Sequence, residues 1–371
     1  MRHPGISTSF PKLVNNGLRY YLSPSQTAAS PLTIYWSINS ICNLKCKMCD
    51  VGQGAEDGTF FKNLRIGKES LYDIELNAFK SVIDEVKNDR PYISLNSTEP
   101  LLYKPLMEAL EYCTQAGLGT SVTTGGYNLP MKADDLARVG LSRLNVSMDG
   151  PADIHNYIRG RPDSFERDIE GIIKFSEACK KYGRKAEICI NCTIMNQNHH
   201  SLVKFVDSIS HLPLDSISFC YQWYISGETA EVHNKEFGDR FRVSESCFSG
   251  EVDPTKVDID VLQNQIDLIR ARNDSRITFL PDLSKEDLRR FYHEPEKFVA
   301  PKGKCMASWF FVQILANGNV IPYTRCHNES FGNINKQSFG EIWNGLKMKS
   351  WRKFIKQQQK MPMCRRCDLI Y

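Results

Sequence analysis

The chain contains 371 residues, 41% hydrophobic and 24% charged, a composition typical of globular proteins. Its net charge of +4 is too small to indicate binding to nucleic acid or to a membrane surface. No apolar run reaches the roughly 18 residues that a membrane span requires, and residues 1–31 lack the pattern of a secretory signal. We therefore expect a cytoplasmic protein without nucleic-acid or membrane partners.

Strand and helix patterns alternate through the first two thirds of the chain. Residues 33–38 are rich in β-branched and aromatic residues, which predicts a strand, and apolar spacing predicts a helix over 70–88. Further strands are predicted at 92–95, 119–124, 143–148, 186–195 and 216–221. Between them lie predicted helices at 104–116, 132–139, 164–182 and 201–210. This alternation predicts an α/β fold with a parallel sheet, whose functional site lies at the carboxyl ends of the strands.

Six such units fit a partial (β/α)6 TIM-like barrel better than a closed eightfold barrel, and a doubly wound sheet is the alternative. We assign residues 31–240 to this core barrel and residues 1–30, which show no clear periodicity, to an N-terminal extension. Residues 241–300 are expected to form the end of the barrel and a bridging segment. Residues 301–371 are expected to form a small, separate α+β module that needs a metal to fold.

Thirteen cysteines are many for a protein of a reducing compartment, where structural disulfides are rare. An odd number also argues against complete pairing. Cys42, Cys46 and Cys49 follow the first predicted strand directly, so their thiolates can converge on one metal centre. Three ligands on a four-iron cluster leave one iron open, as a catalytic metal site requires.

The spacing Cys-x3-Cys-x2-Cys after the first strand of a βα array resembles the radical S-adenosylmethionine (SAM) superfamily. The resemblance implies a [4Fe–4S] cluster on these three cysteines, with the open iron binding the methionine end of SAM. A reductase, flavodoxin or ferredoxin would supply an electron, and cleavage of SAM would give a 5′-deoxyadenosyl radical. Met48, just before the third cysteine, is expected near the adenine. The alternatives are a zinc site or three unrelated thiols.

Segments after the second and fourth strands also resemble SAM-binding elements of this superfamily. Residues 97–100 keep the Glu-Pro of a family Gly-Gly-Glu-Pro element but have Ser97 and Thr98 in place of the glycines. Residues 145–150 resemble a Ser-Leu-Asp-Gly element, and a family-like arginine follows it. The SAM contacts that the resemblance implies on these segments are Asn96, Thr98, Glu99, Asn145, Ser147 and Arg159.

On the fifth strand, Asn191 and Thr193 share one face and are expected to line the adenosine pocket, although hydrogen bonding in the core is an alternative. Glu99 has the alternative role of a helix-start carboxylate before Lys104. Arg159 either binds a carboxylate through two nitrogens of its guanidinium or forms a surface ion pair.

A second set of four candidate ligands lies near the C-terminus: Cys305, Cys326, Cys364 and Cys367. Two apolar runs flank Asn317-Gly318, which predicts a hairpin with a type I′ turn that brings the first two of these cysteines together. Ser338 with Glu341 predicts a capping box at the start of a helix.

This segment resembles the SPASM and twitch modules of radical SAM enzymes. The resemblance implies one auxiliary [4Fe–4S] or [2Fe–2S] cluster, which either exchanges an electron with a substrate radical or is structural. A structural zinc ion is the alternative, because four cysteines suit zinc equally well.

Polar and aromatic side chains at the predicted strand ends are the candidate substrate contacts: Tyr127, Asn128, Gln222, Trp223, Tyr224, Tyr323 and Arg325. Such a set suits a small sugar-, aminocyclitol- or nucleoside-like substrate. The favoured hypothesis is therefore a radical SAM oxidoreductase that dehydrogenates a small molecule, with the auxiliary cluster taking up an electron.

Three alternatives stay open. The first is a radical epimerase in which Cys247, on a predicted loop, donates a hydrogen atom. The second is a peptide- or protein-modifying maturase, although only about 30 residues precede the first strand, fewer than the peptide-recognition domain such enzymes often carry. The third is a non-catalytic zinc protein.

Two further expectations concern the remaining cysteines and the basic tail. Five cysteines in helix or strand patterns are expected to be small buried residues: Cys113, Cys179, Cys189, Cys192 and Cys220. Residues 347–366 contain eight Lys or Arg and no acid, which predicts a solvated helix face.

Overall fold

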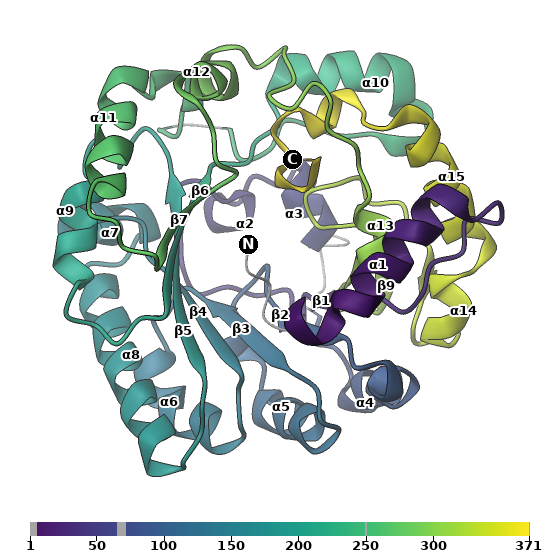
Figure 1. Cartoon of the computed structure of the whole chain (residues 1–371), viewed down its shortest axis with the longest axis horizontal. Helices are drawn as coiled ribbons and strands as arrows, with labels where there is room; N and C mark the ends of the chain where they lie inside the picture. The colour runs from purple at the N-terminus through teal and green to yellow at the C-terminus, as the bar shows by residue number, and fades with distance from the viewer. Residues whose placement is uncertain (1–5, 65–71, 249–250, 371) are drawn as a thin grey trace.

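The computed structural model describes residues 6–64, 72–248 and 251–370, with side chains described from Phe10 onward. Its strands form one ten-stranded sheet in the order β10-β9-β8-β1-β2-β3-β4-β5-β6-β7. The sheet is curved, with helices on its outer side, and the C-terminal end of the chain lies on the concave side (Figure 1). This arrangement confirms the predicted α/β fold class with a partial barrel. No helix in the described ranges is both long and apolar enough to cross a bilayer.

The barrel strands are parallel and follow one another in chain order across the sheet. They are β1 (Thr33–Trp36), β2 (Tyr92–Leu95), β3 (Thr120–Thr124), β4 (Arg143–Ser147), β5 (Glu187–Ile194), β6 (Ser216–Tyr221) and β7 (Ile277–Leu280). The helices between them include α4 (Leu76–Val86), α5 (Leu106–Gln115), α6 (Leu129–Arg138), α8 (Ser164–Lys181), α9 (Leu202–Ile209) and α11 (Ile259–Arg270). The first of these begins at Leu76, and residues 70 and 71 of the predicted helix 70–88 lie outside the described residues.

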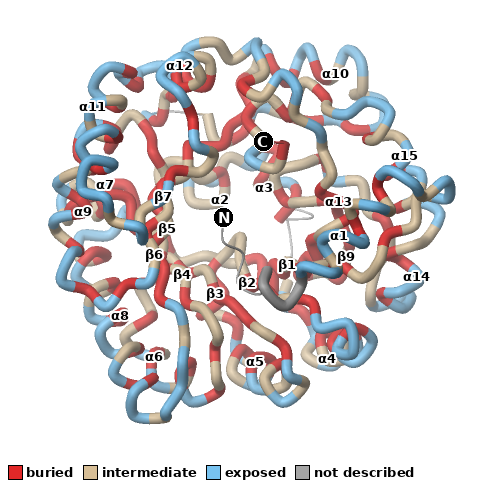
Figure 2. Tube along the Cα trace, in the orientation of Figure 1, coloured by how far each residue is buried: buried red, intermediate tan, exposed pale blue. Residues whose placement is uncertain are grey.

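Side chains alternate between the two faces of the sheet, as the pleat of a strand requires. On β4, Leu144 and Val146 are fully buried under the helices, whereas Asn145 and Ser147 are partly accessible on the inner face. The same alternation continues on β5 and β6, and Figure 2 shows the burial concentrated where helices meet the sheet. The inner face at the carboxyl ends is therefore polar and accessible, which is where a site can form.

Helix α1 (Ile6–Leu22) lies in the segment that shows no clear periodicity. Its apolar side chains are divided between two faces, because Tyr20 packs edge-on against Trp309 while Phe10 remains 61% exposed. A polar residue, Asn16, is fully buried on the packed face, where it bonds to the backbone at Ser30 and Ala29. The packed face thus mixes an aromatic and a polar residue while other apolar residues are exposed, which is why the sequence pattern did not predict this helix.

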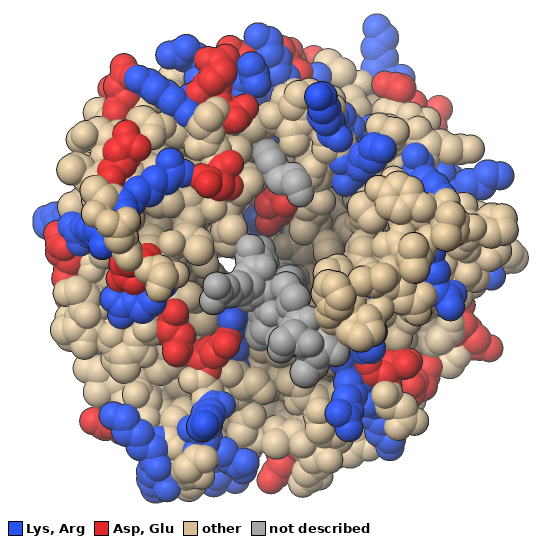
Figure 3. Space-filling view, viewed as in Figure 1, with Lys and Arg blue, Asp and Glu red and all other residues tan. Residues whose placement is uncertain are grey.

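Figure 3 shows an uncharged area over α1, next to basic side chains of the C-terminal helix α15 (Leu346–Gln358). The exposed apolar side chains of α1 are Phe10, Leu13, Val14, Leu18, Tyr21 and Leu22. Elsewhere on the visible face, acidic and basic side chains are interspersed (Figure 3).

The C-terminal hairpin extends the barrel sheet. Strand β8 (Phe311–Ile314) pairs in parallel with β1, and β9 (Asn319–Ile321) pairs antiparallel with β8 and with β10 (Gly332–Asn333). The hairpin at Asn317-Gly318 was predicted, but its type I′ turn was wrong, because only Gly318 (φ 84°) has a positive φ. The amide of Gly318 donates to the carbonyl of Leu315, so the loop is longer than two residues and needs one left-handed glycine.

The basic tail is only partly solvated, contrary to the prediction. Arg352 and Arg366 are buried. The guanidinium of Arg366 donates to the carbonyl oxygens of Arg290 (2.8 Å), Phe291 (2.6 Å) and Glu294 (2.8 Å), at the end of α12 (Lys285–His293). A C-terminal arginine thus satisfies carbonyls that a helix end leaves without partners.

Candidate active site

The first cysteine loop follows β1 and is tied to α7 (Ala152–Arg159). The amide of Lys45 donates to the carbonyl oxygen of Arg159 at 3.3 Å. The side-chain amide of Gln53 donates to the carbonyl oxygens of Lys45 and Cys46, both at 3.0 Å. Gly52 lies so close that a Cβ there would come within 2.7 Å of the amide nitrogen of Cys46. These contacts fold the loop tightly around its central cysteine.

The thiols of Cys42, Cys46 and Cys49 are close enough to interact electrostatically. Burial raises the pKa of Cys42 to about 12 and that of Cys49 to about 11, so both lose a proton only when a ligand compensates for it. Burial also raises the pKa of Cys46, and Arg159 opposes that shift because its Nη1 donates to Sγ at 3.6 Å. A guanidinium in contact with a buried sulfur stabilises the thiolate that binds metal.

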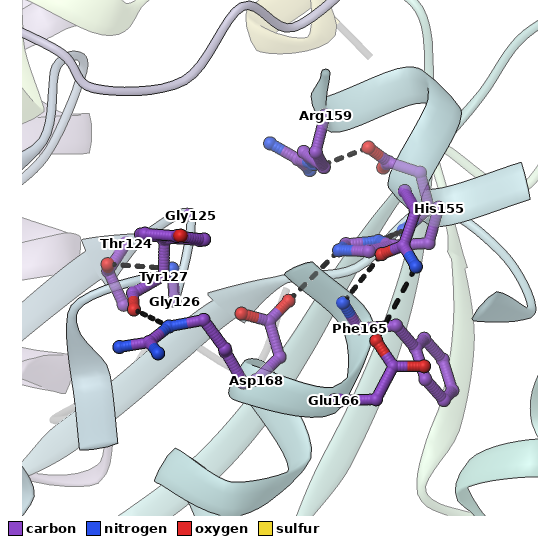
Figure 4. A network of polar contacts seen from close by, with 12 residues as sticks. Thr124, Gly125, Gly126, Tyr127, His155, Arg159, Phe165, Glu166 and Asp168 are labelled. Carbon is purple, nitrogen blue, oxygen red and sulfur yellow. Dashed lines mark hydrogen bonds and ion pairs between the residues drawn. The ribbon is translucent and has the colours of Figure 1, made fainter. Parts of the chain in front are cut away.

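A buried polar network lies next to this loop (Figure 4). Nη2 of Arg159 pairs with Oδ2 of Asp149 at 2.6 Å. The amide of Asp149 donates to Nδ1 of His155 at 3.1 Å, and Nε2 of His155 lies 3.1 Å from Oδ2 of Asp168. Burial lowers the pKa of His155 and raises that of Asp168. Because Nδ1 accepts a backbone N–H, the imidazole is neutral and its proton lies on Nε2.

Glu99 is buried between the loops that follow β2 and β3. Its carboxylate accepts hydrogen bonds from the hydroxyl of Thr124 (2.8 Å) and the amides of Gly125 (2.9 Å) and Leu101 (3.1 Å). The side chain thus caps the short helix η2 (Pro100–Leu102), as the alternative interpretation proposed, and fixes two strand-end loops. Ser97, at a family glycine position, has a φ of 80° in the left-handed region.

The other predicted SAM contacts lie at the carboxyl ends of neighbouring strands. Ser147 on β4 pairs in register with Asn191 on β5, and both are partly accessible on the inner face together with Thr193 and Asn145. Next to β2, the hydroxyl of Thr98 donates to the side chain of Asn39 at 2.7 Å. Asn96 accepts a hydrogen bond from Ser97, and Met48 is half-buried in the first cysteine loop. The fold therefore gathers these residues around one end of the barrel.

The C-terminal cysteines come from three separate segments. Cys305 precedes α13 (Ala307–Phe310), Cys326 follows β9, and Cys364 and Cys367 belong to the turn η4 (Pro362–Arg366) and its end. Their thiols interact electrostatically, and burial raises the pKa of all four, to about 12 for Cys364. Asn63 of α3 (Thr59–Leu64) donates to the carbonyl oxygen of Cys326 at 2.7 Å, which ties this segment to the barrel.

The donor sets fit iron–sulfur clusters. Each set consists of thiols that are mutually close and withdrawn from solvent, as cluster ligands are. Within the described residues, no three His, Cys, Asp or Glu side chains converge tightly enough to hold a single metal ion.

Hydrogen bonds hold the backbone of Cys247 beside the first cysteine loop. Its amide donates to Oδ1 of Asp50 (2.7 Å) and its carbonyl accepts from the side chain of Gln222 (2.7 Å). Its φ of 52° is unfavourable for a residue with a side chain, so the surrounding contacts impose it. Burial raises the pKa of its thiol well above the usual value, and both Asp50 and Cys49 are close enough to add to the shift.

The structure does not bring all the predicted substrate residues together. Arg325 lies over the ring of Trp223 at 5.7 Å and within electrostatic reach of Tyr323 and Cys247, so these residues lie close together near the carboxyl end of β6. Tyr224 is instead fixed in the core, where its hydroxyl donates to the carbonyl of Phe291 at 2.9 Å.

Tyr127 supports the loop after β3, because its ring lies under the guanidinium groups of Arg161 and Arg167 at 5.0 and 4.5 Å. Asn128 is the residue before α6, and its side chain makes no capping hydrogen bond. Both lie on the side of Asp168 (Figure 4 shows Tyr127) rather than beside Arg325.

Sequence reasoning missed four residues of the barrel mouth: Tyr35, Asp50, Cys220 and Asp368. Cys220 was predicted to be buried in the core, but it is partly accessible on the inner face of β6, close to Arg325 and Asp368. The period of two along β6 could have placed it there. Asp368 could not have been found, because only the return of the C-terminus to the barrel brings it close.

The fold, the three-cysteine loop and the strand-end polar residues define a radical SAM enzyme. The sequence matches the Radical SAM superfamily over residues 36–209 and the SPASM iron–sulfur cluster-binding domain over residues 305–368. The chain belongs to the radical SAM superfamily and carries a C-terminal SPASM module. It therefore uses SAM and a [4Fe–4S] cluster, with auxiliary iron–sulfur binding in the C-terminal module.

Two groups of characterised proteins are similar to it. An AdoMet-dependent heme synthase of Methanosarcina barkeri is 31% identical over 180 residues, which cover 47% of this chain and 46% of the relative. A pre-heme d1 synthase of Dinoroseobacter shibae is 23% identical over 336 residues, covering 88% and 77%. The chain thus spans about half the length of the first of these relatives.

Among solved structures, Streptococcus suis SuiB bound to its precursor peptide SuiA superposes with a TM-score of 0.63 at 15% identity, over 95% of this chain and 75% of that chain. The structure of anSMEcpe with bound AdoMet superposes with a TM-score of 0.56 at 18% identity, over 91% and 88%. These likenesses establish the fold.

Proposed function

We propose that this protein is a radical SAM oxidoreductase that dehydrogenates a small polar molecule held in the barrel mouth between the two cysteine sets. The observation that carries this proposal is the position of Arg325 and Tyr323. They follow the C-terminal hairpin. Tyr323 lies within electrostatic reach of Cys367, Arg325 lies within electrostatic reach of Cys247, and Cys247 is close to Cys49. A molecule in contact with them would lie between the two metal-binding sets.

The side chains at this mouth have unused hydrogen-bonding capacity. The guanidinium of Arg325 stacks on Trp223 but has no hydrogen-bond partner among the described residues. The hydroxyls of Tyr35 and Tyr323 lie near it and near Asp368 and are likewise unpaired within the described part of the chain. Cationic, phenolic and carboxylate groups together suit a polyhydroxylated substrate with an ionic group, such as a sugar, aminocyclitol or nucleoside derivative.

When bound, the first cluster and SAM supply a 5′-deoxyadenosyl radical, and the second cluster supplies an electron acceptor. The residues of this chain position the substrate carbon and exclude water from the mouth. Loss of one hydrogen atom, one further electron and one proton leaves a product two hydrogens lighter.

The test uses the anaerobically reconstituted protein with SAM, a strong reductant and a pool of candidate small molecules. We expect 5′-deoxyadenosine and a product two mass units lighter in equal amounts. Replacement of Arg325 by Gln is expected to raise KM for the substrate at least tenfold and leave iron content unchanged. Formation of 5′-deoxyadenosine with a modified peptide or tetrapyrrole, and no lighter small molecule, would contradict the proposal. Formation of a heme-type tetrapyrrole is the outcome that the heme synthase and pre-heme d1 synthase relatives would favour.

The fixed position of Cys247 beside the first cysteine loop favours radical epimerisation as a second candidate function. A half-buried, protonated thiol beside the first cysteine loop would be placed to return a hydrogen atom to a substrate radical. An epimerase leaves the substrate mass unchanged in water and adds one mass unit in deuterated water. Cys247→Ala would then stop turnover after hydrogen abstraction, whereas a dehydrogenase would keep its product.

A further inference from the structure

The guanidinium of Arg159 contacts a cysteine of the first cysteine loop in addition to its ion pair with Asp149. Nη1 of Arg159 lies 3.6 Å from Sγ of Cys46, while Nη2 lies 2.6 Å from Oδ2 of Asp149. One guanidinium therefore bridges a metal-ligand sulfur and a carboxylate. Its side chain is only 7% exposed, and its Nε has no partner among the described residues.

The surroundings of this guanidinium are negative. Asp149, Asp168 and Glu99 are all buried and within electrostatic reach of Arg159. Three thiolates and a cluster would add further negative charge to this region. Reduction adds one more negative charge to a cluster at this site. Because the surroundings have a low dielectric constant, a cation in contact with the cluster ligand strongly affects the energy of the reduced state.

The position of Arg159 depends on a chain of contacts behind it. Oδ1 of Asp149 accepts the amide of Thr193 at 2.9 Å, and the amide of Asp149 donates to His155. His155 in turn is oriented by Asp168 through Nε2 (Figure 4). Asp149 and His155 are each held by at least two contacts, as expected for groups that fix the orientation of a side chain next to a metal ligand.

We propose that Arg159 is a fixed counter-charge for the radical-site cluster, held against Cys46 by Asp149 and, through His155, by Asp168, and that it raises the reduction potential of this cluster. An N–H donated to a cysteine sulfur and a nearby positive charge both favour the reduced, more negative state of a cluster. The proposal concerns the cluster alone and is independent of the substrate.

The test is a redox titration of the reconstituted protein without SAM or substrate, in which electron paramagnetic resonance measures the reduced cluster. The signal that is absent from the triple variant Cys42→Ala, Cys46→Ala, Cys49→Ala is assigned to the radical-site cluster. At a fixed potential, Arg159→Gln is expected to lower the ratio of reduced to oxidised cluster at least tenfold, which equals a 59 mV shift for a one-electron couple. Arg159→Met repeats the comparison if that variant fails to load iron.

Arg161→Gln is the matched control. Arg161 is exposed and donates to the carbonyl of Asn43 (3.0 Å) in the same loop, so the variant loses the same charge without loss of a sulfur contact. We expect a change of less than twofold in the ratio. Equal ratios in the Arg159 and Arg161 variants, or a wild-type potential in the Arg159 variant with only a raised KM for SAM, would overturn the proposal.

His155→Phe tests the positioning part. Because the imidazole carries no net charge, a change in potential in this variant comes from displacement of Asp149 and Arg159. A fall in the ratio smaller than that of Arg159→Gln is expected at unchanged iron content and unchanged circular dichroism. A wild-type potential in His155→Phe would remove His155 and Asp168 from the proposal.

Discussion

Gly126 allows the loop after β3 to approach Asp168. A Cβ at this position would lie 1.9 Å from Oδ1 of Asp168, and the φ of 80° already favours glycine. We expect Gly126→Ala to lower the free energy of unfolding by at least about 2 kcal/mol more than Gly183→Ala. Gly183 is the control because its φ is 62° but nothing lies within 4 Å of its Cβ position. Urea unfolding gives both values, and equal losses would show that the close approach does not matter.

His233 makes stability depend on pH. It is buried in α10 (Gly227–Phe241), and burial lowers its pKa although its Nε2 donates to the carbonyl of Phe241 at 2.7 Å. The unfolded chain therefore takes up a proton first as the pH falls below the usual histidine pKa of about 6.5. The contribution of neutral His233 to the free energy of unfolding is therefore fully present above about pH 6.5. It decreases as the pH falls from about 6.5 toward the lower pKa of the folded state, by at most about 1.4 kcal/mol per pH unit.

His233→Gln is expected to flatten the fall in unfolding free energy between pH 7 and pH 5, because the amide keeps the donor to Phe241 but does not titrate. His200→Gln, at an exposed histidine, is the control for the loss of one imidazole from the chain. Chemical unfolding at a series of pH values measures both slopes. Parallel curves for wild type and His233→Gln would contradict the expectation.

At the scale of elements, the start of α14 (Phe339–Trp343) is capped by two separate groups. The hydroxyl of Ser338 accepts the amide of Glu341 in the predicted capping box, which the structure confirms. The carboxylate of Glu85, on barrel helix α4, accepts the amides of Phe339 (3.1 Å) and Gly340 (3.0 Å). The first cap is local and visible in the sequence, whereas the second depends on the packing of two distant helices.

We expect Ser338→Ala to cost about 1 kcal/mol of stability and Glu85→Ala about 0.5 to 1 kcal/mol. Because the two groups satisfy different amides, the double variant should lose close to the sum. Thermal unfolding of the three variants measures this. A double variant no less stable than Ser338→Ala would mean that Glu85 does not cap the helix.

At the scale of the whole molecule, the C-terminal module and the barrel share one sheet, because β8 pairs with β1. Helix α1 and the Arg366 contacts add further connections between them. We therefore expect calorimetry of the holoprotein to show one cooperative transition. Two well-separated transitions would show that the module unfolds by itself.

The double variant Cys364→Ala, Cys367→Ala is expected to lose about four iron atoms per chain if the auxiliary cluster is [4Fe–4S], and to lower the melting temperature of the whole chain. Cys113→Ala is the control, since Cys113 is buried in α5 away from both cysteine sets. Its iron content should equal that of wild type. Unchanged iron in the double variant would remove these two cysteines from the ligand set.

The sequence by itself determined the parallel α/β fold and the radical SAM and SPASM assignment, because these depend on short-range spacing and on the periodicity of strands and helices. The same spacing predicts both cysteine sets as ligands. It did not determine that α1 is a helix with exposed apolar residues, or that β8 joins the barrel sheet. Only the tertiary structure decided which residues meet across the barrel mouth, such as Asp50 with Cys247 and Arg325 with Asp368. The physical reason is that such contacts join segments far apart in the chain, where no local pattern records the partner.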